Sequence, residues 1–201
     1  MSRFFLIFIP TTILSLSLIL MGQLHSWHWA DFSNNITRVD LSEFNFVSSP
    51  KNLSISHFLT GSCSCSEEIV QYLESKVPFS NSKISEQVLL VDTNKNHSFA
   101  QRLKAKNYSV QFINREKLES GMKEALLGVP LLLINNSNKK VLYIGGYDNN
   151  TITPLTKINL QPIITNALKN KYSQSKPIKG CIVSKEYQKL MDPLGLKYAE
   201  R

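Results

Sequence analysis

Apolar and polar positions change their period along the middle of this 201-residue chain. Short, largely apolar runs, such as 53–59 and 87–92, are typical of buried strands, while apolar residues three to four positions apart predict helices. The pattern predicts strands at 53–59, 87–92, 109–113, 130–135 and 140–145, and helices at 66–76, 96–106, 116–127 and 158–169. Crossover helices favour parallel strands, and the Asn- and Ser-rich turn at 136–139 predicts an antiparallel hairpin. We therefore expect an α/β fold with a central mixed β-sheet flanked by helices.

The N-terminal segment is apolar from 4 to 21, with Ser and Thr as its main interruptions. Roughly 20 apolar residues are needed to cross a bilayer core, so residues 1–22 are expected to form one transmembrane helix. Arg3 before the segment places the N-terminus in the cytoplasm. The rest of this single-pass protein of the inner (cytoplasmic) membrane would then lie on the periplasmic, or extracytoplasmic, side. The alternative is a cleaved signal sequence, which also exports the chain to a compartment where disulfides persist.

Beyond this segment, composition divides the chain into three parts. Residues 23–50 are a polar linker with a candidate short strand at 37–41, residues 51–171 form the folded domain, and residues 172–201 form a lysine-rich tail. The formal net charge is +8, but the lysines are spread along the chain and do not alternate with aromatic residues. This distribution predicts a solvated basic surface, with no nucleic-acid partner.

The chemistry-bearing residues are the three cysteines, Cys63, Cys65 and Cys181. Cys63 and Cys65 fall between an apolar strand and the predicted helix start at Ser66. A thiol at a helix N-terminus feels the positive end of the helix dipole, which lowers its pKa and suits a nucleophile or a metal ligand. Three cysteines are too few for a disulfide scaffold.

Three motifs carry a resemblance to a known family. Phe-Leu-Thr-Gly-Ser-Cys at 58–63 ends the first strand, Gly-Val-Pro at 128–130 precedes an apolar strand, and the hairpin carries Tyr-Ile-Gly-Gly at 143–146 before a last helix. Over residues 53–169 the chain resembles the thioredoxin superfamily. More narrowly, it is similar to bacterial membrane-anchored thioredoxin-like proteins with a Cys-x-Cys site and a Gly-Cys pair near the C-terminus, here 180–181.

The resemblance implies a thioredoxin-like fold and a thiol-disulfide oxidoreductase that needs no cofactor. Cys63 would be the nucleophile that attacks protein disulfides, and Cys65 or Cys181 would resolve the mixed disulfide. Pro130, as a cis-proline, would shape the substrate groove. Partners would be protein thiols or disulfides and an unidentified redox recycling protein. One departure is that only Ser64 separates the first two cysteines, so a disulfide between them would close a tight, easily reduced ring.

Several alternatives stay open at this level. Cys63 or Cys65 could form a structural disulfide with Cys181. The three thiols, with His57, could instead bind a soft metal ion, copper or zinc. A third alternative is a redox-inactive binding module that uses only the groove. Pro130 could be an ordinary loop proline, and His57 is more often structural than catalytic.

Overall fold

The computed structural model describes residues 2–26, 52–79, 83–91, 96–114 and 128–192. Within them, a five-stranded sheet has the order β3-β2-β1-β5-β6. Its strands are β1 Leu53–Leu59, β2 Ile84–Val91, β3 Ser109–Ile113, β5 Leu131–Asn136 and β6 Val141–Gly145. β1, β2 and β3 run parallel, and β5 runs antiparallel to both β1 and β6. The predicted α/β class and mixed central sheet are confirmed.

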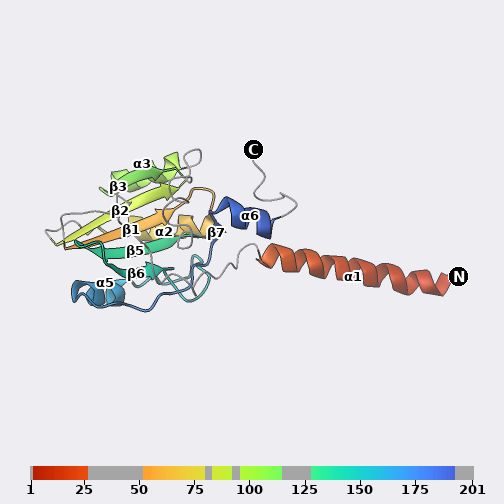
Figure 1. Ribbon diagram of the computed structural model, residues 1–201. Helices are drawn as coiled ribbons and strands as arrows, with labels where there is room; N and C mark the ends of the chain where they lie inside the picture. Colours follow the sequence, from red (N-terminus) through yellow and green to blue (C-terminus); the bar gives the residue numbers. More distant parts are fainter. Residues whose placement is uncertain (1, 27–51, 80–82, 92–95, 115–127, 193–201) are drawn as a thin grey trace.

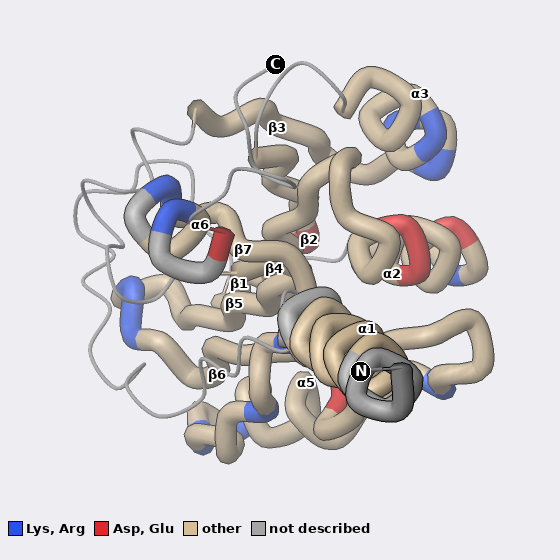
Figure 2. Tube along the Cα trace, turned by 90° about the vertical axis from the view of Figure 1, so that its right-hand side faces the viewer, with Lys and Arg blue, Asp and Glu red and all other residues tan. Residues whose placement is uncertain are grey.

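The described helices are α1 Ser2–Ser26, α2 Ser64–Glu74, α3 His97–Ala105, α5 Gln161–Leu168 and α6 Lys185–Met191. α2 and α3 lie side by side on one face of the sheet (Figures 1 and 2). α2 begins two residues before the predicted start at Ser66, so Cys65 is part of its first turn. The predicted helix at 116–127 and the candidate strand at 37–41 lie outside the described residues.

The core centres on β1, in which every residue is buried. β1 lies between β2 and β5, so both of its edges are paired, and the burial of every residue shows that both of its faces are covered. The polar residues of β1, Ser54, Ser56 and His57, are buried as well, because a strand covered on both faces has no solvent-exposed side. Phe58 and Leu59 are fully buried at its C-terminal end, each contributing about 1.5–3 kcal/mol of apolar burial. They fix the point at which the chain leaves the sheet toward the cysteines.

A second, two-stranded sheet joins distant parts of the chain. β4 Gly128–Val129 pairs antiparallel with β7 Cys181–Ile182, with Gly128 opposite Ile182 and Val129 opposite Cys181. The predicted strand at 130–135 corresponds to β5, and β4 precedes it across the Val129–Pro130 peptide bond, which is cis. The sequence pattern did not predict β7.

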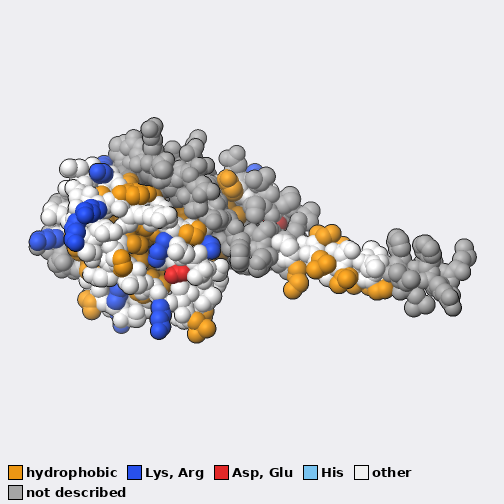
Figure 3. All heavy atoms as spheres, turned by 90° about the horizontal axis from the view of Figure 1, so that it is seen from below, with side chains coloured by type: hydrophobic (Ala, Val, Ile, Leu, Met, Phe, Trp, Pro, Cys, Tyr) orange, Lys and Arg blue, Asp and Glu red, His pale blue; other side chains and the backbone are white. Residues whose placement is uncertain are grey.

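The N-terminal helix α1 includes the apolar segment at 4–21. No helix in the described part of the chain combines the length and the apolar character that crossing a membrane requires. Lysine and arginine side chains are scattered over the domain face seen in Figure 3 rather than gathered in one patch. The predicted solvated basic surface is consistent with that scatter.

Candidate functional site

The loop between β1 and α2 is held by side chains from two neighbouring elements. Thr60 N–H donates to Ser66 Oγ at 3.2 Å, and Gly61 N–H donates to Asn96 Oδ1 at 2.5 Å. Cys63 follows as the N-cap of α2 in an extended conformation, with φ −117° and ψ 120°. The loop therefore delivers Cys63 to the positive end of the α2 dipole, as its sequence position predicts.

The three cysteines converge, although Cys181 belongs to the tail. Cys63 and Cys65 come from the start of α2, and Cys181 comes from β7. All three are buried thiols in the structure. Both Cys181 and Cys65 are hydrogen-bonded through their side chains to Cys63. Cys63 is therefore the centre of the cluster, with a candidate exchange partner on each side.

The surroundings of Cys63 favour a thiolate. Its pKa is lowered mainly by the side-chain hydrogen bond from Cys181, then by that from Cys65, and the backbone N–H groups of Ser66 and Cys181 add to the effect against the opposing cost of burial. The pKa of Cys65 is raised, chiefly because its thiol donates to Cys63 and is itself buried. Cys63 is thus arranged as the anion and Cys65 as a proton donor.

Pro130 lies next to the cysteine cluster. Cys63 Sγ is 3.7 Å from the carbonyl oxygen of Val129, and the peptide bond that follows this carbonyl is the cis bond to Pro130. Cys65 Sγ contacts a different carbonyl oxygen, that of Ile152, at 4.0 Å. The structure thus brings together Cys63, Cys65, Cys181 and Pro130, the four predicted site residues, while their catalytic roles stay predictions.

His57 belongs to a separate buried network. Its Nδ1 is 2.7 Å from Tyr147 Oη and its Nε2 is 2.9 Å from Glu86 Oε1. Both ring nitrogens are therefore engaged, which leaves His57 none for a metal ion in this arrangement. Within the described residues, no group of three or more His, Cys, Asp or Glu side chains is arranged to hold a metal ion.

Glu86 carries the charge of this network. Lys76 Nζ lies 2.5 Å from Glu86 Oε1, and Phe79 N–H donates to Oε2 at 2.8 Å. Burial by itself raises the pKa of Glu86, but the bonds and charges of His57 and Lys76 outweigh it and lower the pKa to about 2. Burial also lowers the pKa of His57, so at neutral pH Lys76 supplies the positive charge.

Sequence reasoning missed three parts of the site. The carbonyl of Val129 and the backbone N–H of Cys181 carry no side-chain signal. Asn96 was predicted only as a helix start, although it is fully buried and its Nδ2 also donates to Val91 O at 2.9 Å. A buried asparagine next to a strand end is a signal that could have indicated this loop-holding role.

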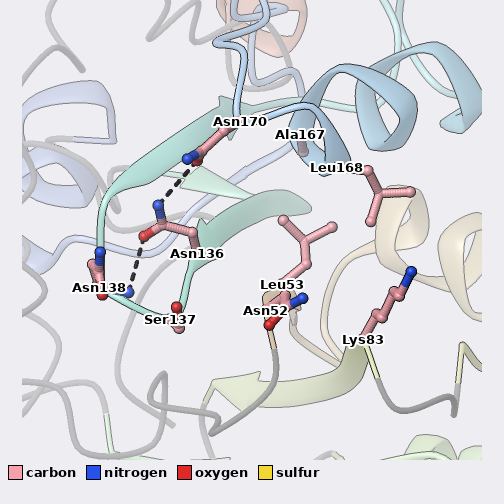
Figure 4. A pocket seen from close by; sticks show the side chains of 9 residues that line it. All are labelled: Asn52, Leu53, Lys83, Asn136, Ser137, Asn138, Ala167, Leu168 and Asn170. Atoms are coloured by element: carbon pink, nitrogen blue, oxygen red, sulfur yellow. Dashed lines mark hydrogen bonds between the residues drawn. The ribbon is translucent and has the colours of Figure 1, made fainter.

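A cavity of about 470 Å³ lies at the other end of β1. Leu53, the first residue of β1, lines it, whereas the cysteines follow the last residue of that strand. Its lining includes Asn136, whose Nδ2 donates to Asn170 Oδ1 at 3.0 Å (Figure 4). The side chains there mainly support the β5–β6 turn, since Asn136 Oδ1 accepts from two backbone N–H groups of that turn. This cavity is separate from the cysteine cluster.

Comparison with known proteins gives distant similarities only. No protein-family model matches the chain, and no curated protein matches it. Among solved structures, an uncharacterized conserved protein from Geobacillus kaustophilus is similar at 14% identity and a TM-score of 0.49, covering 67% of this chain and 77% of that one. StoA from Bacillus subtilis matches at 14% identity and a TM-score of 0.36, covering 48% and 74%.

A proposed thiol-disulfide oxidoreductase from Bacteroides vulgatus is also similar. Its identity is 14% and its TM-score is 0.37, covering 62% of this chain and 76% of that one.

Proposed function

We propose that this protein is a thiol-disulfide oxidoreductase whose nucleophile is Cys63. The observation that carries the proposal is the convergence of two thiols and two backbone N–H groups on Cys63 Sγ at the N-terminus of α2. This environment stabilises a thiolate, which is the form of cysteine that attacks disulfides. Protein disulfides are the proposed substrates.

The proposed exchange has two steps. The Cys63 thiolate attacks one sulfur of the substrate disulfide, a Cys63–substrate disulfide forms, and the other substrate sulfur leaves as a thiolate that takes up a proton. Cys181 or Cys65 then loses its proton and attacks Cys63 Sγ, which releases the second substrate thiol. The substrate gains two electrons and two protons, and the protein is left with one disulfide. A dithiol protein would reduce it again, and the reverse sequence would oxidise a substrate.

The proposal is tested with single substitutions of the three cysteines. The full chain and its Cys63→Ser, Cys65→Ser and Cys181→Ser variants are mixed with a peptide disulfide, quenched with acid and analysed by mass spectrometry. Cys63→Ser should form no adduct, and one of the other two variants should accumulate a Cys63–peptide adduct. Stoichiometric copper or zinc bound by the three thiols, without disulfide exchange, would support the metal-binding alternative instead. Unchanged behaviour of all three variants would leave only the redox-inactive binding module.

We further propose that the domain works outside the cytoplasm. The apolar run at 4–21 supports export, and a redox-active cysteine cluster suits an oxidising compartment. A phosphatase reporter that becomes active only after export, fused after Arg201, should be active in cells. The control is the same fusion without residues 1–22, which should be inactive. Equal activity of both fusions would contradict export through this segment.

A further inference from the structure

β7 covers the edge of β4 next to the thiols. Val129 of β4 lies opposite Cys181 of β7, and the backbone N–H of Cys181 reaches Cys63 Sγ. An extended segment that carries a cysteine is therefore paired with the strand that ends at the cis-proline. Its sulfur is delivered directly to the proposed nucleophile.

Gly180 makes this close pairing sterically feasible. A Cβ at this position would lie 2.1 Å from the carbonyl oxygen of Val129 and 2.8 Å from Cδ of Pro130. Both neighbours belong to backbone or to a rigid ring, so neither can move aside easily. Any segment seated as β7 is seated must have glycine immediately before its cysteine.

The segment around Gly180 is held like a bound peptide. Ile178 and Ile182, on either side of the Gly-Cys pair, are buried. Lys176 C=O accepts from Gly146 N–H at 2.9 Å, and Ile182 C=O accepts from Gln188 Nε2 at 2.7 Å. Main-chain pairing with a sheet edge and buried apolar side chains are the two elements of strand-addition recognition. β7 thus has the contacts of a docked ligand, supplied by the same chain.

We propose that the β4 edge is a docking edge for an extended Gly-Cys segment, and that β7 is its intramolecular occupant. A partner polypeptide with a disulfide-bonded Gly-Cys segment displaces β7 and presents its cysteine to Cys63, and Cys65 is then the resolving thiol, because Cys181 moves away with β7. The identity of this partner class rests on the proposed function, because the docked cysteine is the one that exchanges. The docking itself is independent of any thiol reaction.

The test uses a fluorescent peptide of residues 177–183 in which the cysteine is replaced by serine. It is added to the full-length Gly180→Ala variant, whose own β7 cannot seat, and binding is followed by fluorescence anisotropy. The control is Gln174→Ala, which alters an exposed residue of the same tail. In the control, the chain's own β7 competes with the peptide at a millimolar effective concentration. The peptide should therefore bind to Gly180→Ala about tenfold more tightly than to the control, or more. A second peptide, with alanine in place of its glycine, should not bind.

A measurement on the unaltered chain covers the case in which Gly180→Ala does not fold. An excess of the serine peptide should displace β7 and speed the hydrogen exchange of the Ile182 amide, whereas the alanine peptide should not. Equal binding to both variants, equal binding of both peptides, or unchanged exchange in the unaltered chain would overturn the proposal. Because the probe lacks a thiol, a failure of Cys63 to exchange disulfides would remove the proposed function without changing these results.

Discussion

Cys63 Sγ lies 3.7 Å from the carbonyl oxygen of Val129, directly before the cis bond to Pro130. A carbonyl oxygen accepts a hydrogen bond from a thiol and repels a thiolate. This contact therefore opposes ionisation of Cys63, whereas the hydrogen bonds from Cys181 and Cys65 favour it. The reactivity of Cys63 depends on the balance between these neighbours, which can be shifted by changing one of them.

Replacing Cys181 should reduce the reactivity of Cys63 at low pH. Cys181→Ala removes the side-chain hydrogen bond that lowers the pKa of Cys63 most, so the pKa should rise. The rate at which iodoacetamide alkylates Cys63, followed by peptide mass spectrometry from pH 3 to 10, should show its inflection at higher pH than in the unaltered chain. Cys181→Ser keeps a hydroxyl donor and should shift the inflection less. An unchanged profile in Cys181→Ala would show that this thiol does not stabilise the thiolate.

Mild oxidation should join Cys63 to Cys181. A Cys63–Cys65 bond would close a tight ring across a single residue, whereas β7 brings Cys181 to the other side of Cys63 without that constraint. Treatment with oxidised glutathione, followed by alkylation, digestion and mass spectrometry, should give a peptide pair that contains Cys63 and Cys181. Cys181→Ser should give the Cys63–Cys65 bond or a glutathione adduct. A predominant Cys63–Cys65 bond in the unaltered chain would contradict this prediction.

The sequence predicted the sheet well because β1, β2, β5 and β6 are largely buried and carry apolar residues. The strands predicted at 53–59 and 109–113 match β1 and β3 at both ends. It placed the start of β2 three residues late, because Glu86 and Ser85 do not look like buried strand residues. Glu86 is buried nonetheless, since His57 and Lys76 supply partners from other elements. These partners come from other parts of the fold, so the burial of Glu86 cannot be predicted from the local sequence pattern.

The candidate site was predictable only in part, for a similar reason. The position of Cys63 before a helix is local information and was read correctly. β7 has only two residues, and its pairing partner β4 lies far away in the sequence, so no periodicity marks it. The Gly-Cys pair at 180–181 stands out only through the resemblance to a known family. The steric reason for the glycine became visible only with Val129 in place.

Removing the charge of Glu86 should destabilise the domain. In Glu86→Gln, Lys76 loses its carboxylate partner and His57 its acceptor, and breaking a buried pair in this way costs about 3–5 kcal/mol. Urea unfolding at pH 7 measures the change in the free energy of unfolding. Glu68→Gln removes the same charge from α2 and should change stability by less than about 0.5 kcal/mol. A similar small effect at both positions would contradict the importance of the buried network.

The same network should make the protein sensitive to acid. The pKa of Glu86 is about 2 in the folded state against an ordinary 4.5, so its stabilisation is present above pH 4.5 and is lost as the pH falls toward 2. The pKa of His57 is also lowered, so the unfolded chain takes up this proton first and stability begins to fall below pH 6.5. Urea midpoints between pH 7 and 3 should decrease steadily in the unaltered chain. In Glu86→Gln the decrease below pH 4.5 should be smaller, and an equal slope would contradict this assignment.

Arg102 joins α3 to the helix that carries the cysteines. Its Nε and Nη2 donate to the two carboxylate oxygens of Glu74, at 2.8 and 2.6 Å, and its Nη1 donates to Glu67 at 2.7 Å. Figure 2 shows acidic residues on α2 and basic residues on the neighbouring α3. The Arg102 and Glu67 side chains are 34% exposed and that of Glu74 is 25% exposed, so solvent and salt screen the pairs.

Arg102→Lys should therefore have a modest effect on stability. Lysine cannot reproduce the two parallel bonds to Glu74, and the loss should be about 1 kcal/mol or less in the free energy of unfolding. The difference in the free energy of unfolding from the unaltered chain, measured with urea, should shrink in 1 M NaCl. At that salt concentration the Debye screening length is about 3 Å, so the attraction between surface charges is weak. Lys104→Ala, an exposed change on the same helix, is the control. The alkylation rate of Cys63 should stay unchanged in both variants, since Cys63 is ionised by its own cluster. A slower rate in Arg102→Lys alone would show that this ion pair also positions the thiol.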